Sequence, residues 1–169
     1  MTVKDKNQND IMSQELINSF EIDYIFENKP INRFKNKPTI ENINSRLNNL
    51  KERIENIDNC ELKKSAKQIV FSDGSFESSI MIVGEGPGQK EDELGKPFVG
   101  DAGQLLNKML EAINIKRENV YITNVVNYRP PNNRKPEPSE INRYSEFLRE
   151  HISIIEPKIL ILMGSVAME

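Results

Sequence analysis

Three short apolar runs from residue 80 onward constrain the fold of the chain most strongly. They cover residues 80–83 (IMIV), 120–123 (VYIT) and 158–163 (KILILM). Their apolar residues are consecutive rather than alternating, which is typical of strands in a parallel sheet, because helices cover both faces of such a sheet. Stretches with helical periodicity lie between the runs. We therefore predict an α/β fold with three layers, α/β/α, around a parallel sheet.

Two helices are predicted between these strands, at residues 101–113 and 139–155, with Asp101 and Ser139 as their N-caps. Ahead of the first strand, the Asp-Gly pair at residues 73–74 indicates a turn. The helix at residues 101–113 has five apolar residues at helical spacing, which we expect on one buried face: Leu105, Leu106, Met109, Leu110 and Ile113.

Residues 1–40 differ from the rest of the chain in composition. The first 60 residues hold twelve of the twenty asparagines, and Pro30 and Pro38 interrupt the short apolar stretches there. We predict a polar, partly helical N-terminal extension with little packing at residues 1–40, followed by a folded domain at residues 41–169. That domain opens with a helix at residues 41–56, whose apolar stripe is Ile43, Leu47, Leu50 and Ile54.

The composition excludes several classes of protein. A net charge of −3 over 169 residues has the wrong sign for a general nucleic-acid coat, so any contact with nucleic acid must come from a local basic patch. The sequence holds no run of about 18 apolar residues, the length that a membrane-spanning helix needs. The first residues (MTVKDKNQND) lack the apolar segment of a secretory signal. We expect a cytoplasmic monomer without a membrane partner. The single cysteine, Cys60, rules out an intramolecular disulfide and a metal site built only from cysteines of one chain.

The first strand ends in a glycine-rich loop at residues 84–88 (GEGPG). It fits a dinucleotide-binding fingerprint poorly, since Gln89 stands where the third glycine belongs and Pro87 lacks a backbone N–H. A plain tight turn explains the glycines but not Glu85. This carboxylate follows the carboxyl end of a strand, which is where ligands bind in open α/β sheets.

Two further residues are expected at the same edge. Asn124 ends the second strand, either as a turn former or as a side chain that binds an amide-like edge through one donor and one acceptor. Phe98 lies between Pro97 and Gly100, either as a core residue or as a stacking platform. Because parallel strands end at one edge, we expect Glu85, Asn124 and Phe98 to form a pocket for a planar heterocycle with hydrogen-bonding edges.

The loop at residues 128–138 (YRPPNNRKPEP) adds three cations beside this edge: Arg129, Arg134 and Lys135. Taken alone, it is either a solvated basic loop or a phosphate-binding one. Its prolines lower the cost of ordering it on a partner. A heterocycle pocket next to it favours contact with nucleic-acid phosphates.

Three long motifs between residues 84 and 167 resemble those of the family 4 uracil-DNA glycosylases. They are GEGPGQKEDELGKPFVGDAGQLL at residues 84–106, YITNVVNYRPPNNRKPEPSE at residues 121–140 and LMGSVA at residues 162–167. The resemblance covers roughly residues 47–169 and implies a three-layer fold with a four-stranded parallel sheet, of which three strands are present here. It also implies base-excision repair of uracil-containing DNA, in which uracil leaves the stack, enters a pocket and is released by N-glycosidic hydrolysis.

The resemblance assigns a role to each residue of the expected pocket. Phe98 would stack on the flipped uracil, and Asn124 would bind its amide edge and reject cytosine. Glu85 would position or polarise the water and stabilise the cationic sugar. The residues whose backbone would line the base and hold its developing negative charge are Gly84, Glu85, Gly86 and Pro87. The residues expected beside the DNA backbone are Arg129, Arg134 and Lys135.

One departure from the family pattern concerns its 4Fe-4S cluster. The family holds this cluster with four cysteines, and their positions fall on Ile57, Cys60, Tyr128 and Tyr144 here. Only Cys60 is retained, and tyrosine is not a standard ligand of such a cluster. We therefore expect no cluster and no other metal. Tyr128 and Tyr144 are large enough to pack in its place.

A second departure lies at the C-terminal end. The family continues through a further strand to a His-Pro-Ser motif whose histidine contacts uracil, and these 169 residues hold no such motif. His151, the only histidine, does not align with it, and we expect an ordinary helix surface or interface residue. The resemblance thus indicates a domain incomplete at its C-terminus, with an unpaired edge on the strand at residues 158–163. The alternatives to an active glycosylase are a catalytically weak or inactive remnant and a nucleotide-binding α/β module.

Overall fold

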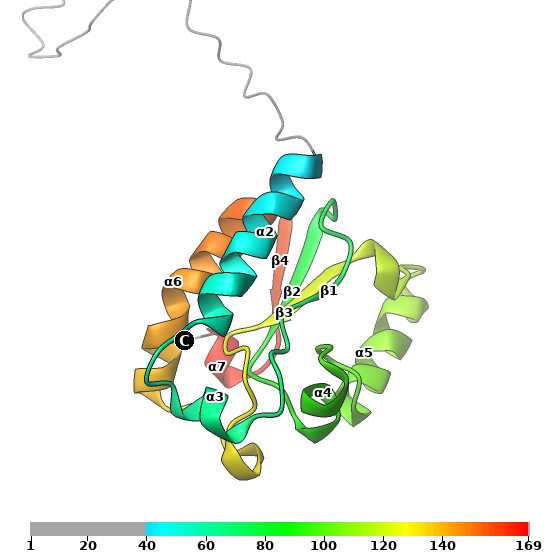
Figure 1. Ribbon diagram of the computed structural model, residues 1–169. Coiled ribbons are helices and arrows are strands. Elements are labelled where there is room, and N and C mark those ends of the chain that lie inside the picture. Colours follow the sequence, from blue (N-terminus) through cyan, green and yellow to red (C-terminus); the bar gives the residue numbers. More distant parts are fainter. Residues whose placement is uncertain (1–39, 169) are drawn as a thin grey trace, which may run out of the picture. The chain divides into compact units, whose positions relative to one another are not determined.

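Figure 1 shows helices packed around a sheet whose strands run in the order β1-β3-β2-β4. The computed structural model describes residues 40–168. β2 (Ile80–Gly84) lies between β3 (Tyr121–Asn124) and β4 (Ile159–Leu162) and pairs parallel with both. The predicted α/β fold with a parallel sheet is therefore confirmed.

β1 (Asp73–Gly74) adds a short antiparallel strand on the other side of β3. The prediction of a turn at these two residues is wrong, and Gly74 supplies the physical reason. Its φ is +89°, and a Cβ at this position would lie 1.8 Å from the carbonyl oxygen of Val120. The missing side chain is what lets this segment approach β3 closely enough to pair.

Helices cover the two faces of the sheet as predicted. α2 (Ile40–Glu55) and α6 (Pro138–Ile155) lie side by side over one face, and α5 (Asp101–Ala112) lies over the other (Figure 1). Alternate residues of β2 belong to different cores, Met81 with the α2 and α6 layer and Ile82 with the α5 layer. The shorter elements are α3 (Glu61–Ser65), α4 (Gln89–Leu94), α7 (Ser165–Met168) and the 3-10 turns η1 (Arg117–Asn119) and η2 (Pro131–Asn133).

The N-caps of the two long predicted helices differ from the expected residues. Glu137 rather than Ser139 caps α6, and the Glu140 carboxylate accepts the backbone N–H of Glu137 at 2.7 Å in a capping box. Gly100 caps α5, and Asp101 is the first residue of that helix. Both helices thus begin one or two residues away from where the capping signals place them.

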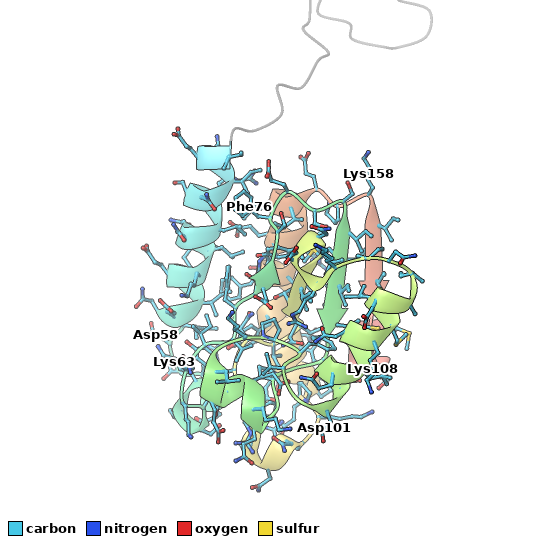
Figure 2. The ribbon with its side chains drawn as sticks, turned by 90° about the vertical axis from the view of Figure 1, so that its right-hand side faces the viewer. Asp58, Lys63, Phe76, Asp101, Lys108 and Lys158 are labelled. Atoms are coloured by element: carbon cyan, nitrogen blue, oxygen red, sulfur yellow. The ribbon has the colours of Figure 1, made fainter. Side chains whose placement is uncertain are left out.

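α5 buries a narrower stripe than the sequence predicts. Leu106 and Leu110 are buried, but Leu105, Met109 and Ile113 are 52–62% exposed, so the prediction of one buried face is wrong for these three. A helix on an open sheet contacts it along one stripe, and the apolar residues beside that stripe point sideways. Figure 2 looks onto this layer, with α5 in front of the sheet and Lys108 on its outer side.

β4 also departs from its predicted burial. Its four apolar side chains are 37–54% exposed, whereas the sequence predicts a strand buried on both faces. Among the described residues β4 pairs only with β2, so its other edge is open, as expected. Position at the edge explains the difference, because the helix layers bury the central strands and leave this one accessible.

The predicted extension at residues 1–40 lies outside the described residues, except for Ile40, which begins α2. The helix predicted at residues 41–56 is confirmed as α2, and it buries Leu47, Leu50 and Ile54. Within the described part of the chain, no helix combines the length and the apolar character needed to cross a membrane.

His151 lies on α6 with its side chain buried between this helix and the sheet. Its ring stacks on Phe71 with 4.6 Å between the ring centroids. A hydrogen bond of 2.6 Å joins its Nε2 to the hydroxyl of Tyr121 on β3. Burial lowers the pKa of His151 to about 4 and raises that of Tyr121. His151 is therefore an interface residue of the core, and it is neutral near pH 7.

Acid should weaken the fold through His151. Its pKa falls from an ordinary value of 6.5 to about 4 on folding. Between these pH values the unfolded chain binds a proton that the folded chain does not. This contribution to the free energy of unfolding is therefore complete above pH 6.5 and is lost as the pH falls toward 4. Urea unfolding at about pH 7 and about pH 5, followed by circular dichroism, measures the loss. His151→Gln should reduce the pH dependence, and an equal loss in both proteins would contradict this account.

Candidate functional site

The carboxyl ends of β2 and β3 open into a pocket of about 360 Å³. Glu85, Phe98 and Asn124, the three side chains that the sequence places at this edge, all line it. The structure thus brings together the residues expected to bind a planar heterocycle. The other lining residues are Gly86, Gly88, Glu91, Ala102, Met163 and Gly164.

Strand register brings Asn124 to the pocket. β2 and β3 run parallel, and Asn124 is the register partner of Gly84. The pairing continues past the strands, because the Val125 N–H donates to the Gly84 carbonyl at 2.8 Å and the Val126 N–H donates to the Glu85 carbonyl at 3.3 Å. The side chains of Glu85 and Asn124 therefore extend from neighbouring paired segments at the same edge of the sheet.

The side-chain amide of Asn124 is buried without a complete set of hydrogen bonds. The residue is 4% exposed, and its Nδ2 has no hydrogen-bond partner among the described residues. A buried donor left unpaired costs about 1–3 kcal/mol. Such groups are rare in folded proteins, and a functional role is one explanation for them. Because Asn124 also lines the pocket, its amide is a candidate donor to a ligand bound there.

Phe98 lies against the end of β2 and forms a wall of the pocket. A Cβ on Gly84 would stand 2.5 Å from Asn124 Oδ1 and 2.6 Å from the Phe98 ring, so only glycine allows this approach. Phe98 is half-buried and packs against the core under α5. The ring therefore serves both predicted alternatives, closing the core on one side and lining the pocket on the other.

Glu85 is held by the start of α7. Its Oε1 accepts hydrogen bonds from the Val166 backbone N–H at 3.1 Å and from the Ser165 hydroxyl at 3.3 Å. Lys135 Nζ donates to Ser165 Oγ at 2.9 Å, so a residue of the basic loop is linked to Glu85 through one hydroxyl. The sequence analysis missed Ser165. Its position directly after a strand and Gly164 was the available signal.

A second carboxylate, Glu91 on α4, joins two loops of the pocket. Its Oε1 accepts the backbone N–H groups of Val99 at 2.9 Å and Gly100 at 2.7 Å. Its Oε2 accepts the backbone N–H of Gly88 at 3.1 Å. An ionised acceptor makes these bonds strong. The sequence analysis missed this residue as well, and it fixes the loop that carries Phe98 to the loop that carries Glu85.

The basic loop lies beside the pocket, and other side chains of the loop and of α6 engage its cations. Arg134 makes a bidentate pair with Glu140 at 2.8 and 2.7 Å, which holds the pKa of Glu140 below its usual value. Arg129 Nε donates to Asn133 Oδ1 at 2.7 Å. Pro87 lines a hollow of about 140 Å³ with this loop and is not among the residues that line the larger pocket.

Comparison with known proteins agrees with this geometry. A family model described as the Uracil DNA glycosylase superfamily matches residues 71–169. The chain belongs to the uracil-DNA glycosylase superfamily. The match contains the pocket and the basic loop, and the interpretation as a nucleotide-binding module gains no support from it.

Relatives of the chain carry the name Type-4 uracil-DNA glycosylase, which confirms the resemblance. That of Pyrobaculum aerophilum is 45% identical over 121 residues, covering 72% of this chain and 62% of the relative. That of Thermotoga maritima is 44% identical over 117 residues, covering 69% and 61%. That of Archaeoglobus fulgidus is 44% identical over 108 residues, covering 64% and 54%. The chain thus spans 54–62% of the length of these relatives.

The four positions that the resemblance aligns with cluster cysteines meet in one core of this chain. Cys60, Tyr128 and Tyr144 are buried there, and Ile57 packs against this core. A contact of 3.4 Å joins Cys60 Sγ and the Tyr144 hydroxyl. Burial raises the pKa of both tyrosines, that of Tyr128 to about 12. One thiol beside two neutral phenols does not fit an iron–sulfur cluster, and the described residues hold no group of three or more His, Cys, Asp or Glu side chains placed for a metal ion.

Gly84→Ala should destabilise the glycosylase fold at the pocket. The new methyl group would overlap Asn124 Oδ1 and the Phe98 ring, and overpacking of this kind costs about 1–3 kcal/mol. Urea unfolding monitored by circular dichroism measures the change. The control is the same substitution in a Phe98→Ala background, where one of the two overlapping groups is gone and the loss should be smaller. An equal loss with and without the Phe98 ring would contradict the close approach described here.

Proposed function

We propose that this chain carries the base-binding pocket of a glycosylase that excises uracil from DNA. One observation carries the proposal, the buried Asn124 amide that lines the pocket with an Nδ2 lacking a partner among the described residues. Its desolvation cost is recovered when a ligand supplies an acceptor. Membership of the superfamily and the names of the relatives support uracil as that ligand.

Asn124 would separate uracil from cytosine by the direction of two hydrogen bonds. Its Oδ1 would accept the N3–H of uracil, and its Nδ2 would donate to O4. Cytosine presents an unprotonated N3 and an amino group at the same two places, so both contacts would be mismatched. The Phe98 ring would stack on the face of the base and hold it in the plane of the amide.

Glu85 would act on the sugar side of the base. Its carboxylate would orient a water molecule toward C1′ and stabilise the positive charge that grows on the sugar as the C1′–N1 bond breaks. The electron pair of that bond goes to uracil, the water oxygen bonds to C1′, and the proton lost by the water passes through the carboxylate to solvent while solvent protonates the released base. The bonds from Ser165 and from the Val166 N–H support this role by fixing the carboxylate at the pocket wall.

The DNA backbone would lie along the basic loop. A base can enter the pocket only after it leaves the stack, which brings its flanking phosphates to the pocket rim. Arg129, Arg134 and Lys135 supply positive charge there, and the prolines of the loop reduce the entropy lost on contact. We expect the DNA to be bound by a monomer of this chain in the cytoplasm.

Excision of uracil is tested with a single-stranded oligonucleotide that contains one uracil. Alkali should cleave the strand after incubation with the chain, and Glu85→Ala and Asn124→Ala should each lower the rate about 10²–10³-fold, as the loss of one charge-stabilising group does in other enzymes. Asn142→Ala is the matched control, because this asparagine is exposed on α6 and should leave the rate unchanged. If the chain binds the oligonucleotide but cleaves no faster than Glu85→Ala, the protein is a non-catalytic relative, and this proposal is wrong.

We further propose that no iron–sulfur cluster is bound at Cys60. The packing of Tyr128 and Tyr144 around this thiol supports the proposal, since their phenol rings lie where cluster ligands would be needed. Protein purified without oxygen should contain neither iron nor acid-labile sulfide in stoichiometric amount. Colorimetric iron and sulfide assays measure both. Four irons per chain would refute the proposal.

A further inference from the structure

Phe98 adopts a backbone conformation that its side chain disfavours. Its φ is +52°, in the left-handed region that residues other than glycine, asparagine and aspartate rarely occupy. Strain of this kind persists only where neighbouring groups hold the backbone in place, and it gathers at functional sites. The residue that forms the stacking wall of the pocket is therefore also the one whose backbone needs an external support.

Arg117 on η1 supplies that support. Its Nη1 donates to the Phe98 carbonyl at 3.0 Å, and its Nη2 donates to the Pro97 carbonyl at 2.6 Å. The guanidinium is itself held from its other side, because Nε donates to Asp73 Oδ2 at 2.9 Å and Nη1 donates to Asn107 Oδ1 at 3.1 Å. The Arg117 side chain is 22% exposed, so solvent screens these bonds only in part.

The opposite side of the same segment is fixed by Glu91, which accepts the N–H groups of Val99 and Gly100. α5 approaches the segment too closely for a side chain at position 103, because a Cβ on Gly103 would lie 1.9 Å from the Phe98 carbonyl oxygen. Arg117 thus binds the carbonyls of Pro97 and Phe98. Glu91 binds the N–H groups of the next two residues. With both sides held, the backbone at Phe98 is fixed, and its ring lies against Gly84 and beside Asn124.

We propose that Arg117, oriented by Asp73, is a positioning residue that holds the Phe98 ring in place for a base in the pocket. The identity of the base rests on the proposed function, whereas the positioning itself does not. Arg117 lines neither of the two hollows at this edge, so it acts through Phe98 rather than on the substrate. Lysine has the charge but cannot donate to Asp73 and to two successive carbonyls in one planar geometry.

Arg143 provides a matched control in the same chain. It donates to the carbonyls of Asp58 and Asn59, and Asn59 has a φ of +49°. Each arginine therefore donates to the carbonyl of a left-handed residue. Arg117 binds Phe98, which lines the pocket, and Arg143 binds Asn59, which does not. Arg143→Lys should cost stability of a similar kind without moving the Phe98 ring.

The test uses the NMR shift that the Phe98 ring current imposes on the Hα protons of Gly84. Phe98→Ala identifies this shift in the full chain. Arg117→Lys should abolish most of it, while Arg143→Lys should leave it intact. With the uracil oligonucleotide, Arg117→Lys should raise KM several-fold and change kcat less. It should have no further effect in the Phe98→Ala background, because its influence passes through the ring.

An unchanged Gly84 shift in Arg117→Lys overturns the proposal, whatever the activity of the chain. If Arg117→Lys does not fold by circular dichroism, Asp73→Asn replaces it and should reduce the same shift partly; no reduction there overturns the proposal as well. A chain that cleaves no uracil but loses the shift in Arg117→Lys would refute the proposed function and retain the positioning role. The two proposals therefore fail separately.

Discussion

The pocket depends on the register between β2 and β3 together with the glycine at position 84. Parallel pairing sets Gly84 beside Asn124, and the absence of a Cβ leaves room for the Phe98 ring against both. A shift of one residue would turn every side chain of β2 to the opposite face and remove Met81 and Val83 from their core. The apolar core thus stabilises the register that leaves the Asn124 Nδ2 buried without a partner among the described residues. The free energy lost on that amide is small beside the burial of two strands, and this is why the fold can hold such a group.

Two charged side chains near the pocket, Glu91 and Arg117, bind backbone groups of its loops. Glu91 accepts three N–H groups from two loops, and Arg117 donates to two successive carbonyls. The loops around the pocket therefore lose their conformational freedom when the chain folds rather than when a ligand arrives, which favours tight and oriented binding. The link from Lys135 through Ser165 to Glu85 has a different character, because it is exposed and joins the loop expected beside DNA to the proposed catalytic carboxylate. If an anionic phosphate drew Lys135 toward itself, Ser165 would lose this partner, while the Val166 N–H would still donate to Glu85.

The sequence was sufficient for the parts of the site that follow from strand ends. Asn124 closes one apolar run and Glu85 follows another, and parallel strands bring such positions together whatever the loops do. The residues that hold the loops could not be found in this way. Arg117 is 44 residues from Asp73 and 19 from Phe98, and its bonds to carbonyls follow no periodicity that a single sequence displays. The exposed side of α5 was missed for a related reason, since an apolar residue at helical spacing is buried only where a neighbouring layer reaches it.

Segments that are distant in sequence can be joined by a metal cluster or by side-chain packing, and the core around Cys60 lies where three such segments meet. Cys60 precedes α3, Tyr128 opens the basic loop, and Tyr144 lies on α6, so their contact ties together three segments that are distant in sequence. Thiolates on a cluster would join such segments through metal bonds and make their order depend on redox state. On the proposal that no cluster is bound, burial of two aromatic rings and the contact between Cys60 and Tyr144 do the joining. The order of the basic loop then depends on side-chain volume, and oxidising conditions should leave it unchanged as long as the buried thiol stays out of reach of solvent.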